Sequence, residues 1–211
     1  YLLERLPLST RNFEPYLRVN ERFAAAVAAH YRPGDLIWVH DYQLALVPGY
    51  LRKLLPDAVI GFFLHVPFPS ADVFRILPWR EEILRGLLGA DLLGFHTAGY
   101  RHNFAHSAAI VLGIDIGTDT LVLDDRTVRI GVYPISIDGA SFARAAAHPD
   151  VQREVDKLRA DTGRKRIVLG IDRLDYTKGI PRRLLAIDRL LRNQPVLRES
   201  VHFIQLAVPT R

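Results

Sequence analysis

Short runs of apolar residues recur along this chain, and segments with helical spacing separate them. The apolarity of each run is continuous rather than alternating, which is typical of strands in a parallel sheet covered on both faces. In the intervening segments, apolar residues recur every three or four positions, as on one face of a helix. This alternation predicts a doubly wound α/β fold. The six runs are 35–39, 59–64, 91–95, 128–132, 167–169 and 202–206.

The alternation pauses at residues 138–148, a polar and alanine-rich stretch before Pro149 begins a new helix. We therefore predict a domain boundary near Ser136, which divides the chain into domains 1–136 and 137–211. Apolar pairs on both sides of two aspartates predict a hairpin over residues 121–129. The chain contains no methionine, even at position 1, so we expect it to be a segment of a longer protein.

Composition narrows the possible partners. The formal net charge of +5 allows an anionic ligand, but the longest basic cluster is the triplet at 164–166 and no aromatic residues interleave with it. We therefore expect no nucleic-acid partner. The absence of cysteine excludes disulfides and thiolate metal sites. No apolar run approaches the roughly 20 residues that span a bilayer, and no signal peptide is visible. These features predict a cytoplasmic protein without a membrane partner, and they do not fix whether it forms a homo-oligomer.

Residues suited to ligand chemistry follow four of the apolar runs. In open α/β sheets, ligands bind beyond the carboxyl ends of the strands. Two cations also lie beside a helix start at Gly179 and Pro181, where free backbone amides favour a phosphate group. We therefore expect a site for a phosphorylated ligand. Its candidate residues are Asp41, Tyr42, His65, Arg173, Lys178 and Arg211.

Each of these residues also has a structural explanation. A lone histidine at a strand end, such as His65, is more often structural than catalytic. Asp41 could simply cap the helix that follows it. Arg173 and Lys178 could be solvated surface cations, and Arg211 is the last residue of the sequence. Their concentration at strand ends favours a binding site, because solvation alone would not gather them there.

Five segments occur in a characteristic order: WVHDYQL at 38–44, FFLHVPFPS at 62–70, GFHT at 94–97, DRLDYTKGIP at 172–181 and QLAVPTR at 205–211. With these segments the chain resembles the trehalose-6-phosphate synthases, retaining glycosyltransferases of family 20. The resemblance implies a GT-B fold of two facing Rossmann-like domains. Residues 1–136 would be most of the acceptor-side N-terminal domain, and 137–211 the beginning of the nucleotide-sugar-binding C-terminal domain.

The family transfers glucose from UDP-glucose to glucose 6-phosphate and uses no metal or cofactor. The resemblance implies that Arg173 and Lys178 bind the donor diphosphate and that His65 lies beside the transferred glucose, all three being catalytic. It places Asp41, with the adjacent Tyr42, at the acceptor. Arg211 would bind the acceptor phosphate. The chain also has no Asp-x-Asp triplet of the kind that holds a divalent ion in other transferases.

Some family elements would lie outside this sequence. The N-terminal glycine-containing loop and an upstream tyrosine and tryptophan would precede Tyr1, and an acidic donor-binding stretch would follow Arg211. We therefore expect the segment alone to be inactive. Two alternatives stay open: a related enzyme with another phosphorylated acceptor, such as glycerol 3-phosphate, and a non-catalytic regulatory subunit. The sequence also leaves open the nucleotide (UDP, GDP or ADP) and a following phosphatase domain.

Overall fold

A computed structural model describes residues 13–123, 126–163 and 165–209. The chain divides between Ser136 and Ile137 into two compact units. Within the described ranges, no helix is both long enough and apolar enough to cross a lipid bilayer.

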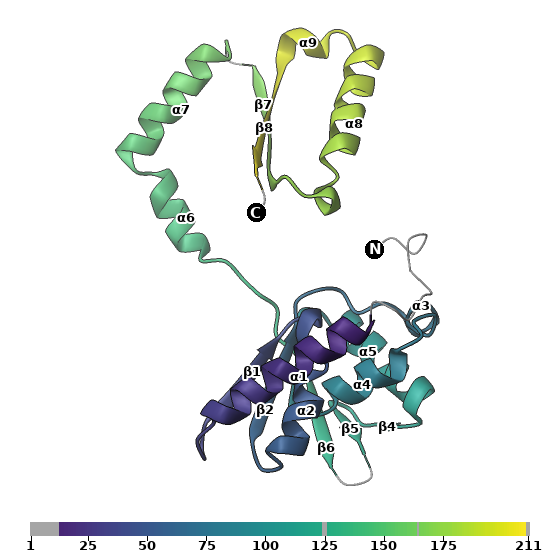
Figure 1. Ribbon diagram of the computed structural model, residues 1–211. Helices are drawn as coiled ribbons and strands as arrows, with labels where there is room; N and C mark the ends of the chain where they lie inside the picture. The colour runs from purple at the N-terminus through teal and green to yellow at the C-terminus, as the bar shows by residue number, and fades with distance from the viewer. Residues whose placement is uncertain (1–12, 124–125, 164, 210–211) are drawn as a thin grey trace. The chain divides into compact units, whose positions relative to one another are not determined.

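The first unit is built on a six-stranded sheet in the order β1-β2-β3-β6-β5-β4 (Figure 1). The first four strands in this order are parallel, whereas β5 and β4 are added antiparallel. The α/β class and the hairpin predicted over 121–129 are therefore confirmed. The strands are β1 (Leu36–His40), β2 (Val59–Leu64), β3 (Leu92–Phe95), β4 (Asp115–Ile116), β5 (Thr120–Val122) and β6 (Thr127–Val132). The helical elements are α1 (Phe13–His30), η3 (Tyr42–Leu44), α2 (Val47–Leu54), α3 (Ala71–Phe74), α4 (Arg80–Leu87) and α5 (Ala98–Leu112).

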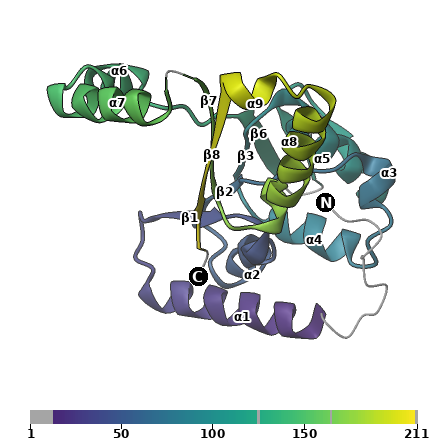
Figure 2. The same cartoon turned by 90° about the horizontal axis from the view of Figure 1, so that it is seen from above.

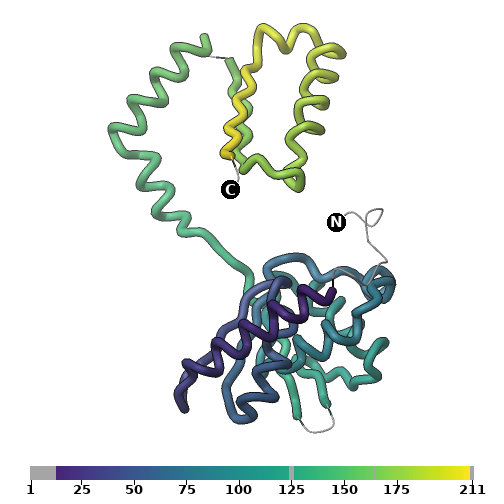
Figure 3. Tube along the Cα trace, in the orientation of Figure 1, coloured from purple at the N-terminus to yellow at the C-terminus, as the bar shows by residue number. Residues whose placement is uncertain are grey.

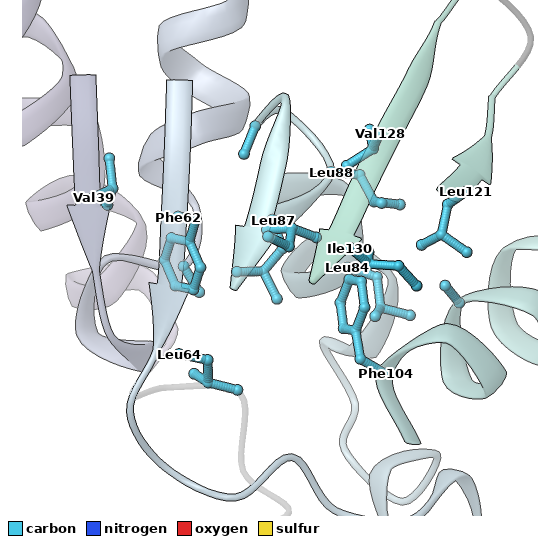
Figure 4. Packing of buried hydrophobic residues seen from close by; sticks show 14 of the residues in the cluster. Val39, Phe62, Leu64, Leu84, Leu87, Leu88, Phe104, Leu121, Val128 and Ile130 are labelled. Carbon is cyan, nitrogen blue, oxygen red and sulfur yellow. The ribbon is translucent and has the colours of Figure 1, made fainter. Parts of the chain in front are cut away.

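The core of this unit lies between the sheet and its helices. Figure 2 shows α1, α2 and α4 on the same side of the sheet, and Figure 4 shows Leu84 and Leu87 of α4 among buried side chains of the strands, such as Ile130 of β6. Phe62 from β2, Leu84 from α4 and Phe104 from α5 are among the buried residues of one continuous cluster. Burial of this apolar area is the main favourable contribution to the stability of the unit.

The opposite face of the sheet carries residues that stay accessible. Along β1, exposed and buried side chains alternate, with Trp38 68% exposed and Val39 6% exposed. The expectation that the strands are covered on both faces is therefore wrong for the described part of the chain. The reason is that a continuous apolar run does not reveal which of its two faces is covered.

Helix α5 illustrates how local sequence sets an element's limits. The Thr97 hydroxyl accepts a hydrogen bond from the Tyr100 amide at 3.2 Å and so caps the start of the helix. The helix ends at Gly113, whose φ of 69° lies in the left-handed region that glycine adopts without steric cost.

The amino ends of the strands are held by Asp91, which precedes β3. Its carboxylate accepts hydrogen bonds from Arg52 at 2.8 Å, from Arg126 at 2.7 Å and from the Ile60 amide at 2.7 Å. This network ties α2, β2 and the β5–β6 hairpin together at the end of the sheet opposite the candidate site.

The second unit contains a two-stranded parallel sheet, in which β7 (Arg166–Arg173) pairs with β8 (Val201–Val208) along their full lengths. In Figure 3 the trace of β8 runs beside that of β7. Arg183 connects helix and sheet, because its Nη1 donates to Asp172 Oδ2 and to Gln205 Oε1, each at 2.7 Å. The other elements are α6 (Gly139–Ala146), α7 (Pro149–Asp161), η4 (Tyr176–Lys178), α8 (Ile180–Asn193) and α9 (Leu197–Ser200).

Helix α6 occupies the stretch where the sequence pattern pauses. None of its residues is buried, so this helix contributes no apolar stripe to a core in the described part of the chain. Asp138 starts this helix by accepting a hydrogen bond from the Ser141 amide at 2.9 Å. Alanine's high helix propensity accounts for the helix in the absence of a buried stripe.

Candidate functional site

Asp41 follows directly after β1 and has an unusual backbone conformation. Its φ of 66° and ψ of 166° form a backbone conformation that residues other than glycine rarely adopt. Three hydrogen bonds hold it: its amide donates to the Phe63 carbonyl at 2.8 Å, its carbonyl accepts from the Leu44 amide at 3.1 Å, and its Oδ1 accepts from the His65 amide at 3.2 Å. Such conformations cost about 1–3 kcal/mol and cluster at functional sites.

The contacts of Asp41 also bear on the capping alternative. It stands at the start of η3 but makes no side-chain cap hydrogen bond there, so the capping alternative is wrong. Its carboxylate is instead directed to the residue that follows β2. Asp41 and His65, which are 24 positions apart in the sequence, are therefore brought together at the carboxyl edge of the sheet.

Three histidines lie near this edge of the sheet. His40 ends β1, His65 follows β2 and His96 follows β3. His40 Nδ1 lies 3.0 Å from His65 Nε2, a hydrogen-bonding distance, and the rings of His65 and His96 meet edge to face with centroids 5.6 Å apart. We call these residues the histidine row. The sequence analysis assigned only His65 to the site, although a histidine at the end of each of three successive apolar runs was a signal for all three.

Aromatic packing keeps the histidine row in place. The Phe63 ring lies 4.8 Å from that of His65 and 4.9 Å from that of His96, measured between centroids. Gly94 leaves room for Phe63, because a Cβ at this position would lie 2.6 Å from the Phe63 ring. The row borders a pocket of about 470 Å³ on the accessible face of the sheet. The pocket is lined by Trp38, His40, Gly61, Phe62, Phe63, His65, Leu92, Gly94, His96, Tyr133 and Ile135.

Tyr42 is the first residue of η3, and its side chain is exposed. Its backbone is held by Tyr16 of α1. The Tyr16 hydroxyl donates to the Tyr42 carbonyl at 2.5 Å and accepts from the Ala45 amide at 3.1 Å. Burial of the Tyr16 hydroxyl raises its pKa to about 12. The neutral phenol is therefore part of the support of the Asp41 turn.

The second unit presents the two predicted cations on one connection. Arg173 ends β7, Lys178 ends η4, and α8 begins immediately after Gly179. Asp175 shapes the turn between them by accepting hydrogen bonds from the Thr177 amide and hydroxyl, both at 2.9 Å. These hydrogen bonds lower the pKa of Asp175, and the positive charges of Arg173 and Lys178 lower it further.

This connection is suited to an anion. Gly179, at the N-cap of α8, has no side chain to satisfy the amides of the first turn, and its φ of 64° fits the left-handed region. Free amides at a helix start, two exposed cations and the helix dipole together favour a phosphate-bearing ligand.

The structure therefore groups the predicted residues as follows. Asp41, Tyr42 and His65 lie together at the carboxyl edge of the first unit, and Arg173 and Lys178 lie on one connection of the second. Arg211 lies outside the described residues. Within 13–123, 126–163 and 165–209, no group of three or more histidine, aspartate or glutamate side chains is arranged to hold a metal ion.

Similarity to known proteins identifies the family of this chain. The model of a family described as glycosyltransferase family 20 matches residues 6–211. The chain belongs to glycosyltransferase family 20. Its curated relatives include a bifunctional trehalose-6-phosphate synthase/phosphatase of Thermoproteus tenax, 46% identical over 95% of this chain. They also include an alpha,alpha-trehalose-phosphate synthase (UDP-forming) of Dictyostelium discoideum, 42% identical over 100% of the chain, and a trehalose-6-phosphate synthase of Mycobacterium avium, 44% identical over 94%. The chain spans only 28%, 29% and 42% of their respective lengths.

Solved structures of family 20 relatives match the whole fold. An E. coli protein bound with UDP-2-fluoro glucose covers 99% of this chain with a TM-score of 0.88 and 32% identity, and the chain covers 46% of that protein. A Burkholderia xenovorans synthase in complex with glucose-6-phosphate covers 99% with a TM-score of 0.86 and 34% identity, and the chain covers 47% of it. The predicted family and GT-B fold class are confirmed by these similarities.

Proposed function

We propose that the full-length protein is a trehalose-6-phosphate synthase, which transfers glucose from UDP-glucose to glucose 6-phosphate with retention of configuration. The observation that carries the proposal is the connection from Arg173 to Lys178. In this family 20 chain it gathers two cations around one turn at an uncapped helix start.

The chemistry of the donor explains why these cations matter. When the bond between glucose and UDP breaks, negative charge develops on the diphosphate. Cations that are already in place stabilise that charge more strongly in the transition state than in the ground state, and so accelerate the reaction. We assign this role to Arg173 and Lys178 and expect no divalent metal or other cofactor to be required.

Retention is explained by departure and attack on the same face of the sugar. The anomeric C–O bond to UDP breaks while a new C–O bond forms to the acceptor hydroxyl. The proton of that hydroxyl passes to the leaving phosphate oxygen, so the step balances without an external base. In this proposal His65 lies beside the transferred glucose, and Arg211 binds the acceptor phosphate.

Asp41 serves the acceptor in this proposal, together with Tyr42. A carboxylate offers about four lone-pair directions, of which the contact to the His65 amide uses one. The remaining directions can accept hydrogen bonds from the sugar hydroxyls of glucose 6-phosphate. The backbone hydrogen bonds of Asp41 hold the carboxylate in position before the acceptor arrives.

A second candidate function is a non-catalytic domain. It is considered because a similar fold belongs to a protein described as a phosphatase: a Candida albicans trehalose-6-phosphate phosphatase N-terminal domain covers 100% of this chain with a TM-score of 0.87 and 34% identity. Loss of chemistry in such a domain would leave cleft residues free to change, whereas here Asp41, His65, Arg173 and Lys178 all fit their proposed roles.

The test is UDP release by the purified full-length protein with UDP-glucose and one acceptor at a time. We expect release with glucose 6-phosphate, and trehalose 6-phosphate as the product. Release only with glycerol 3-phosphate would replace the acceptor in the proposal, and no release with any acceptor would support the non-catalytic alternative. Replacing UDP-glucose by GDP- or ADP-glucose determines the nucleotide, and chelation with EDTA should leave the rate unchanged. Imaging of the tagged protein tests the expected cytoplasmic location.

A further inference from the structure

The hydrogen bond within the histidine row has a consequence for the chemistry of His65. A neutral imidazole has one nitrogen that donates and one that accepts. Because His65 Nε2 lies 3.0 Å from His40 Nδ1, this nitrogen of His65 is already engaged. Whichever ring donates, the nitrogen of His65 that stays available to a ligand is Nδ1.

His40 is itself held firmly enough to act as a support. It is the last residue of β1, where its register partner on β2 is Phe63. Its ring packs against that of Trp38, with centroids 4.4 Å apart, and against that of His65 at 5.3 Å. The strand and the indole therefore limit the movement of the His40 ring, and with it that of the nitrogen facing His65.

We propose that His40 is a positioning residue: it holds the His65 ring through Nε2 and leaves Nδ1 to face the transferred sugar. The backbone of His65 is held separately, by the Asp41 carboxylate. Asp41 therefore holds the main chain of His65, and the adjacent His40 holds its ring. The expected effect of His40 on the reaction rate rests on the proposed function, whereas the pairing of the two histidines does not.

Two substitutions of His40 distinguish the contribution of its hydrogen-bonding nitrogen from that of the size of its ring. His40→Phe keeps a ring against Trp38 and removes the hydrogen-bonding nitrogens. His40→Asn loses the ring but places an amide atom near the position of Nδ1. The matched control is His102→Phe in α5, because His102 belongs to another stacked histidine pair, with centroids 5.9 Å apart, that does not line the pocket.

Kinetics of the full-length protein with UDP-glucose and glucose 6-phosphate form the first arm. We expect His40→Phe to lower kcat by about 2- to 12-fold, the rate equivalent of one net hydrogen bond, with the KM for glucose 6-phosphate nearly unchanged. His40→Asn should recover part of the loss, and His102→Phe should have no effect. In a His65→Phe background, His40→Phe should cause little further loss, because its effect is exerted through His65.

The second arm is independent of activity. In full-length protein labelled with ¹⁵N-histidine, long-range proton–nitrogen spectra at alkaline pH distinguish the two neutral tautomers of each ring. The His65 signals are identified by their loss in His65→Phe. We expect the His65 nitrogen shifts, above all that of Nε2, to change in His40→Phe, where the partner nitrogen is lost, and to stay closer to those of the unmodified protein in His40→Asn.

The outcomes separate the two proposals. If the unmodified protein releases no UDP, the proposed function fails and the spectra alone decide the pairing. Identical His65 nitrogen shifts in the unmodified protein and in His40→Phe would overturn the positioning role. So would losses from His40→Phe and His65→Phe that multiply in the double variant, because they would show that the two residues act independently.

Discussion

The strained backbone at Asp41 leads to a prediction about stability that can be separated from activity. Asp41→Ala and Asp41→Gly both remove the carboxylate and its hydrogen bond to the His65 amide. They differ in one respect: alanine must adopt the φ of 66° against the preference of its Cβ, whereas glycine adopts it without a steric penalty. The difference in stability between the two variants therefore reports the strain.

The magnitude follows from two opposing contributions. The conformation costs a residue with a side chain about 1–3 kcal/mol. Glycine also loses more conformational freedom on folding, which offsets about 0.5–1 kcal/mol of that gain. Taking the middle of each range, we expect Asp41→Gly to be more stable than Asp41→Ala by about 1 kcal/mol.

The assay is chemical denaturation of the two full-length variants side by side, with the free-energy difference taken from the midpoints at a common slope. Asp41→Asn is a useful third variant, because asparagine tolerates positive φ and keeps an oxygen that can accept from the His65 amide. All three variants should use glucose 6-phosphate poorly, since none carries the charge. A glycine variant equal to or less stable than the alanine variant would refute the strain argument. Collapse of UDP affinity with normal acceptor kinetics would show that Asp41 serves the other ligand.

Further predictions concern the donor cations, the base of the sheet and a buried phenol. Arg173→Ala or Lys178→Ala should each lower kcat by about 10²–10³-fold. The control Arg166→Ala, at the other end of β7, should have little effect. Near-normal turnover of the Arg173 or the Lys178 variant would exclude a role of that residue at the leaving group. Asp91→Ala should lower the free energy of unfolding by about 2 kcal/mol, measured by denaturation. The loss is smaller than for breaking a fully buried ion pair because the Asp91 side chain is 42% exposed. An unchanged denaturation midpoint would contradict this prediction. Tyr16 should titrate at about 12, identified by comparing the ultraviolet titration with that of Tyr16→Phe. Because the folded pKa lies above the unfolded value, this tyrosine's contribution to stability should be lost as pH rises from 10 to 12, and a midpoint near 10 would refute its burial.

Much of the local structure was predictable because it depends on neighbouring residues. The apolar run 59–64 coincides with β2, and Thr97 caps α5 as its position predicts. Other strand ends were predicted less accurately: the run at 167–169 lies in the first half of an eight-residue strand that reaches Arg173. The polar residues at the ends of that strand hid its length, because a strand held by pairing with β8 does not need to be apolar throughout.

The candidate site was only partly predictable. Asp41 and His65 were identifiable, since each follows an apolar run, but the hydrogen bond that connects them was not. The positive φ of Asp41 and the contact between His40 and His65 depend on the register of β1 against β2. Register is decided by long-range packing, which a pattern along one segment does not contain.

By itself, the sequence determined the α/β class, the order of strands and helices and the residue types at the strand ends, because propensity and hydrophobic spacing act over a few neighbouring residues. The tertiary structure decided which face of the sheet the helices cover and which strand ends meet. It alone brought His65 into hydrogen-bonding contact with the strained Asp41, 24 positions away, and with His40, 25 positions away. The physical reason is that such contacts form only when separate strands pair and pack, and the free energy of that packing then holds conformations that no local preference would select.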